Sequence, residues 1–304
     1  MNADVALANE RNRKIKIGFN NFAHAVDHYV MLIFPTVVIG LEAVYGRPYN
    51  ELLALGTASF FAFGLFSLPA GWLADRWSRG YMMVVPDDRG QKAGRSSAPE
   101  VRLSVGIMVA VFALFIVIGV TAGLVFNTVT IALPKVVDER IGNSISLVAV
   151  GGIATAIFLC GAIAQFTVGR VLEKYPAHLV FAFTGLMQFI GVVWVAYATG
   201  FALLAALAFA MAFIYAQVTV NDFVIARYTA DSWRGRVYAV RYFITYVISG
   251  AAISMIWLLH GRGGFDLVLT VTAVIALGFL FGTAAVALLV NGVERDIRTA
   301  QPAE

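Results

Sequence analysis

The sequence predicts an all-helical membrane protein. Of its 304 residues, 60% are hydrophobic and only 13% are charged, and the mean hydropathy is +0.81. A soluble chain of this composition would expose too much apolar surface to water, so the lipid bilayer must be its solvent. In addition, the chain contains roughly eight apolar runs near the length of about 20 residues that a helix needs to cross a membrane.

The expected spans are separated by short polar connections. They cover residues 17–44, 51–75, 103–133, 145–169, 177–197, 201–225, 237–259 and 266–290. The first span follows a basic arm, as a signal peptide would, but it contains His24, Asp27 and His28 and is too long for one. It is therefore expected to be a retained helix. The later spans are mostly Ala, Val, Leu, Ile and Phe, as lipid-exposed and helix-packing surfaces require.

Basic residues are distributed unequally between the two sides of this arrangement. With the N-terminus in the cytoplasm, 18 of the 22 Lys and Arg residues fall on the cytoplasmic side, and the other four are Arg47, Lys135, Arg140 and Arg262. This positive-inside bias predicts eight helices with both termini cytoplasmic, in the inner (plasma) membrane of a bacterium. The sequence pI of 9.2 is explained by this topology, so no nucleic-acid partner is expected.

Two segments of the chain repeat at a nearly constant offset. GWLADRW and GRVLEKY share a glycine, an acid and a base at the end of an apolar span, and the matched residues lie 98 positions apart: Gly71 and Gly169, Asp75 and Glu173, Arg76 and Lys174. Upstream, FPTVVIGLE, with Glu42, is similar to LPKVVDER, with Asp138 and Glu139. The first two spans therefore correspond to the third and fourth.

The first copy of the repeat ends early. After YMMVV the chain enters PDDRGQKAGRSSAPE, whose Pro, Gly, Ser and charged residues are typical of a linker. The second copy continues through four further spans. The comparison predicts that the first copy has lost its last four helices, and an even number leaves the orientation of everything downstream unchanged.

These motifs resemble the major facilitator superfamily of secondary transporters. Gly71, Asp75, Arg76 and Arg79 match its G-x-x-x-D-R-x-x-R-R loop, although Gly80 stands where a second base is usual, and SWRGRVYAVRYF is similar to the start of its eleventh helix. The resemblance implies two six-helix halves, here reduced to two plus six. The implied parts are a partial N-terminal half (1–85), a cytoplasmic linker (86–101), a complete C-terminal half (102–292) and a cytoplasmic tail (293–304).

The resemblance also implies a role for the loop motif. In the family its acid meets the N-terminal end of the eleventh helix and a base from the fourth, which closes the cytoplasmic side. Asp75 and the start of that helix are present here, but the fourth helix is not. A solvated cytoplasmic turn explains the same residues equally well. The matching residues of the second copy are Gly169, Glu173 and Lys174.

The first span contains the strongest set of candidate functional residues. His24, Asp27 and His28 share one helical face, with Asn20 one turn earlier. Asp27 falls near mid-membrane, where a charge costs about 2.5–3.5 kcal/mol on insertion scales, so a role in binding substrate or relaying protons is the default hypothesis. Mutual capping or helix-packing hydrogen bonds are the alternative. Weaker candidates for the substrate pathway are Asn127, Gln217, Asn221, Asp222 and Arg241, each of which also suits a packing or interfacial role.

The remaining patterns give little support to an enzyme or a channel. No nucleotide-binding, metalloprotease or nucleophile-elbow motif is present, so no enzyme activity, cofactor or metal site is expected. The single cysteine, Cys160, lies in an apolar run and is interpreted as packing. Two functions remain open. The chain is either a transporter of a small molecule, coupled to protons through Asp27, or a truncated protein that transports nothing unless partner helices or a homo-oligomer complete its cavity.

Overall fold

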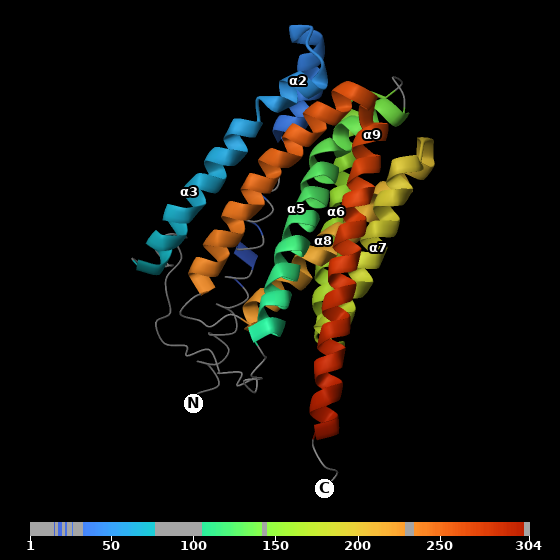
Figure 1. Cartoon of the computed structure of the whole chain (residues 1–304). Coiled ribbons are helices and arrows are strands. Elements are labelled where there is room, and N and C mark those ends of the chain that lie inside the picture. Colours follow the sequence, from blue (N-terminus) through green and yellow to red (C-terminus); the bar gives the residue numbers. More distant parts are fainter. Residues whose placement is uncertain are drawn as a thin grey trace.

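The structure is a computed structural model, and it describes Ile15, Gly18, Phe19, Phe22, Val26 and the ranges 33–76, 105–141, 145–228 and 234–300. Within these ranges the regular structure is helical. A helix from Ile33 to Tyr45 is followed by α2 (Tyr49–Ala54), α3 (Thr57–Arg76), α5 (Val105–Ile141), α6 (Leu147–Leu172), α7 (Ala177–Tyr197), α8 (Gly200–Tyr228) and α9 (Arg234–Ala300). The all-helical membrane fold is therefore confirmed (Figure 1).

Five helices of the described chain are long and apolar enough to cross a membrane. The last of them, Phe243–Val290, contains a sharp bend at Gly263 and Gly264. Gly264 has a φ of 61°, a left-handed conformation that side chains other than that of glycine rarely adopt. The bend divides α9 into two arms, 234–262 and 265–300, which Figure 1 shows turning back on each other next to α2.

The expected spans agree with these helices to within a few residues over much of the chain. The expected 177–197 coincides with α7, and 201–225 lies within α8. The third span was expected to end at 133, which is wrong, because α5 continues through Pro134 to Ile141. The charged residues of KVVDER are thus helical. Their charges are compensated by ion pairs with one another and with other helices, so they do not need a water-exposed loop.

The centre of the bundle is the second half of α5. Every residue from 127 to 137 is buried, so other elements cover this helix on all sides. A Cβ added at Gly123 would meet Ile248 of the first arm of α9, and one added at Gly282 of the second arm would meet Ile118. The two arms of α9 therefore lie against different parts of the α5 surface. This packing places the C-terminal end of α5 beside α2 and the bend of α9.

Candidate functional site

The predicted proton pathway lies largely beyond the part of the chain that the structure describes. Asn20, His24, Asp27 and His28 are outside the described residues, which become continuous only from Ile33. Arg79 is also outside them. Gly71, Asp75 and Arg76 lie on α3 and Arg241 lies on α9, but the structure describes only the backbone at these four positions. The roles given to all these residues therefore stay predictions.

Asn127 is buried in the interface between α5 and the first arm of α9. Its side-chain oxygen accepts a hydrogen bond of 2.7 Å from Ser249, and its amide nitrogen donates to the carbonyl of Gly123 at 2.8 Å. Asn127 and Ser249 are 2% and 0% exposed, respectively. Both polar groups of Asn127 thus have a partner within the bundle, as buried amide groups usually do, and its place in a substrate pathway stays a prediction.

Three other predicted pathway residues lie on α8, and the second copy of the loop motif lies at the end of α6. Gln217 is buried, whereas Asn221 and Asp222 are half-buried one turn further along α8. Glu173 and Lys174 are exposed where α6 ends, and a side chain at Gly169 would meet no atom within 4 Å. The motif containing these three residues therefore ends an apolar helix, as the repeat comparison expects, without packing inside the described bundle.

A cluster of charged residues occupies the end of the bundle that contains α2 and the bend of α9, which we call the α2 end. At its centre is Lys135 of α5, only 7% exposed. Its Nζ forms an ion pair with Glu42 of helix 33–45, and further pairs with Asp138 Oδ2 at 3.0 Å and Glu139 Oε1 at 3.9 Å. Three carboxylates thus surround one buried cation, which compensates for its lost hydration.

Two further residues complete this group. Tyr49 of α2 is fully buried, its ring lies 5.6 Å from the nitrogen of Lys135, and its backbone N–H donates to Glu42 at 2.9 Å. Burial, reinforced by the charges of Glu42 and Glu139, raises the pKa of Tyr49 well above its ordinary value, so its hydroxyl stays neutral. From α9, His260 Nε2 lies 3.2 Å from Glu139. We call these six residues, Glu42, Tyr49, Lys135, Asp138, Glu139 and His260, the Lys135 cluster.

Next to this cluster, Arg140 connects α5 to the end of α7 and to α9. Its Nη1 donates to the carbonyls of Val195 at 2.7 Å and Ala198 at 3.2 Å, where α7 ends, and its Nη2 donates to Asp266 of α9 at 2.6 Å. The last carbonyls of a helix lack intrahelical partners, so a cation placed there is favourable. The last turns of α5 therefore contact helix 33–45, α7 and both arms of α9.

Sequence reasoning missed this cluster as a site. It paired the segments of Glu42 and of Asp138 and Glu139 as repeats, but it assigned Lys135 and Arg140 to a loop. The signal available was the spacing of Lys135 three and four residues before two acids, which suits ion pairs on one helix. The contact with Glu42 lies 93 residues away in the chain and has no local signature.

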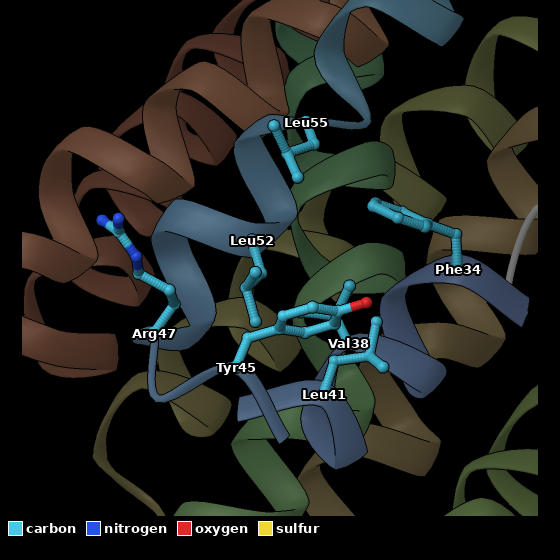
Figure 2. Close-up of a pocket in the computed structure, with 7 residues that line it drawn as sticks. All are labelled: Phe34, Val38, Leu41, Tyr45, Arg47, Leu52 and Leu55. Carbon is cyan, nitrogen blue, oxygen red and sulfur yellow. The ribbon is translucent and has the colours of Figure 1, made fainter. Parts of the chain in front are cut away.

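A small pocket lies on the outer side of the same end. It has a volume of about 340 Å³ and is formed by helix 33–45, α2 and the turns next to them. Figure 2 shows Leu41, Tyr45 and Leu52 gathered around it, whereas the guanidinium of Arg47 points away from it. Arg47 is paired with Glu51 at 3.1 Å. Apart from Arg47, the residues that line the pocket are therefore apolar or aromatic.

The comparisons with known proteins found similarity among solved structures. No family model matches the chain, and no curated protein matches it. Among solved structures, the chain is similar to FucP, a major facilitator superfamily transporter in the outward conformation, with a TM-score of 0.50 and 16% identity. The chain has a fold like that of major facilitator superfamily transporters. At this identity the likeness concerns the fold alone.

The match covers only part of each of the two chains. It covers 68% of this chain and 50% of FucP, so the chain spans about half the length of the transporter it matches. The MFS-like bundle places the two repeat-related segments in contact through Glu42 and Lys135. The loss of four helices from the first repeat is not tested by this match and stays a prediction.

Proposed function

We propose that the chain is a secondary active transporter of a small molecule, which works by alternating access of a central site to the two sides of the membrane. One observation supports this most directly. The ends of two repeat-related helices, 33–45 and α5, meet through Glu42 and Lys135. Transporters built from repeats move one repeat unit against another around a central site, so contacts between corresponding elements are where such motion is controlled.

Proton coupling is the second part of the proposal. Asp27, with His24 or His28 on the same helical face, takes up a proton on one side and releases it on the other. A carboxylate near mid-membrane binds protons more tightly than one in water, because desolvation disfavours its charged form. Asp27→Asn should therefore abolish proton-driven uptake and leave exchange of substrate less affected. An unchanged pH dependence of uptake in this variant would refute the coupling.

A second candidate function rests on the observation that the match covers only 50% of the FucP chain. If the first repeat lacks four helices, then one wall of the cavity is missing and the chain alone transports nothing. The described structure leaves α6 widely uncovered, with Val148 85% and Phe166 68% exposed, although lipid alone is able to cover such a face. In this case a second copy of the chain or another helical subunit completes the wall.

Reconstitution into proteoliposomes separates these functions. Entrapped pyranine reports proton movement when each of a panel of neutral, anionic and cationic small solutes is added outside. The same measurement is made on a version with a third-to-sixth-helix segment of a related transporter inserted after Val85, and native mass spectrometry gives the oligomeric state of both. Equal solute-dependent flux from the two proteins supports the transporter. Flux from the restored version alone supports the incomplete chain.

A further inference from the structure

The three carboxylates around Lys135 belong to different parts of the fold. Asp138 and Glu139 lie three and four residues after Lys135 on the same helix, so they move with it. Glu42 comes from helix 33–45 and is the member that links two separate segments. A relative movement of the two helices would therefore separate Lys135 from Glu42 but not from Asp138 or Glu139.

If helix 33–45 separated from α5, both Glu42 and Lys135 would still have a polar partner. Lys135 would keep Asp138, already at 3.0 Å, and would approach Glu139, now at 3.9 Å. Glu42 would keep the N–H of Tyr49, which lies seven residues further along its own segment. An uncompensated buried charge is strongly unfavourable, so partners of this kind lower the energy of the separated state far more than that of the closed one.

The surrounding contacts are consistent with a boundary between helix 33–45 and α2 on one side and α5 and α9 on the other. Glu139 is held on the α5 side by His260 of α9. Two hydrogen bonds that cross to α2 are long: the Tyr49 hydroxyl donates to the carbonyl of Ile131 at 3.5 Å, and the Asn50 amide donates to the carbonyl of Trp257 at 3.3 Å. Nearby, α3 meets the first arm of α9 through ring contacts such as that of Phe63 with Tyr246, and packed helices of this kind tolerate small sliding movements.

We propose that the contact between Lys135 and Glu42 is a reversible latch at the α2 end, and that Asp138 and Glu139 are positioning residues that hold Lys135 while the latch is open. The purpose of such a latch rests on the proposed transport function, because alternating access requires one end of the bundle to open and close. Its existence rests only on the geometry of the Lys135 cluster.

Distances between spin labels test the latch in the full chain, reconstituted in lipid nanodiscs. Labels are attached at Val44→Cys and Tyr197→Cys in a Cys160→Ala background, since both positions are exposed and lie at the α2 end on separate segments. We expect a main short distance and a minor longer one. Glu42→Gln should increase the longer population several-fold. Asp138→Asn with Glu139→Gln should decrease it several-fold, because Lys135 then depends on Glu42 alone.

This second result distinguishes the latch from a simple structural ion pair. If Asp138 and Glu139 only stabilise the end of α5, their removal will leave the longer population unchanged or increase it, and the inference is wrong. Should that variant fail to fold, exchange of the pair by Glu42→Lys with Lys135→Glu provides the test. The exchanged acid lies beside Asp138 and Glu139, whose repulsion disfavours separation, so the longer population should again fall. A wild-type balance in the exchanged protein would overturn the proposal.

The outcome is separable from that of the proposed function. A single, unchanged distance in all variants removes the latch but leaves the flux measurement untouched. The expected distance changes without solute-dependent flux from either reconstituted protein remove the transport function but leave the latch.

Discussion

Arg140 provides the sharpest test of how the α2 end is held together. Arg140→Ala removes two hydrogen bonds to the carbonyls of Val195 and Ala198 and one ion pair with Asp266. These partners differ greatly in exposure. Val195 and Ala198 are 0% and 7% exposed, whereas the side chain of Asp266 is 90% exposed. The structure therefore predicts that the two carbonyl contacts, rather than the ion pair, account for most of the contribution of Arg140.

The magnitudes follow from this difference. A hydrogen bond from a charged donor contributes about 1.5–3 kcal/mol, so the loss of two should lower the free energy of unfolding by roughly 3–4 kcal/mol once their sharing of one nitrogen is considered. An exposed ion pair contributes about 0–1 kcal/mol. A change of 1 kcal/mol shifts the melting temperature of a large domain by about 2–4 °C. Arg140→Ala should thus lower the melting temperature by roughly 6–16 °C, and Asp266→Asn by no more than about 4 °C.

Thermal unfolding in one detergent, followed by tryptophan fluorescence, measures both shifts. Arg140→Lys is the matched control, because it keeps the charge but loses the planar group that reaches two carbonyls and a carboxylate at once. It should fall between the other two variants. If Asp266→Asn destabilises the protein as much as Arg140→Ala, then the ion pair dominates and the reasoning from burial is wrong.

Three further predictions concern packing, pH and topology. Gly185→Ala should lower stability by about 1–3 kcal/mol because the new Cβ overlaps the side chain of Thr283, whereas Gly151→Ala, which meets no atom within 4 Å, should be neutral or stabilising; their melting temperatures decide this. The raised pKa of Tyr49 means that the unfolded chain loses this proton first as the pH rises above about 10, so stability should fall there by up to about 1.4 kcal/mol per pH unit from this group, and the fall should be shallower in Tyr49→Phe. In a Cys160→Ala background, cysteines at Arg47 and Arg262 should react with an impermeant reagent from the outside of right-side-out vesicles and one at Lys174 should not; labelling of all three from one side contradicts the eight-helix topology.

The sequence by itself determined the class and the course of the chain. Apolar runs of membrane-spanning length are local features, and they located α6, α7 and α8 closely, because a helix in lipid must satisfy its backbone groups within itself. Gly263 and Gly264 fall in the expected connection between the last two spans, and the bend of α9 is there. The repeat comparison likewise paired segments that the structure brings together.

Only the tertiary structure decided where the charges near the α2 end belong. From sequence, Lys135 and Arg140 were loop residues, because a charge beyond an apolar run normally marks the membrane surface. In the structure α5 continues past them, since Glu42 supplies Lys135 with a partner from 93 residues away and the end of α7 supplies Arg140 with carbonyls. Such compensation depends on which helices become neighbours. No local pattern specifies that, because it is set by the packing of the whole bundle.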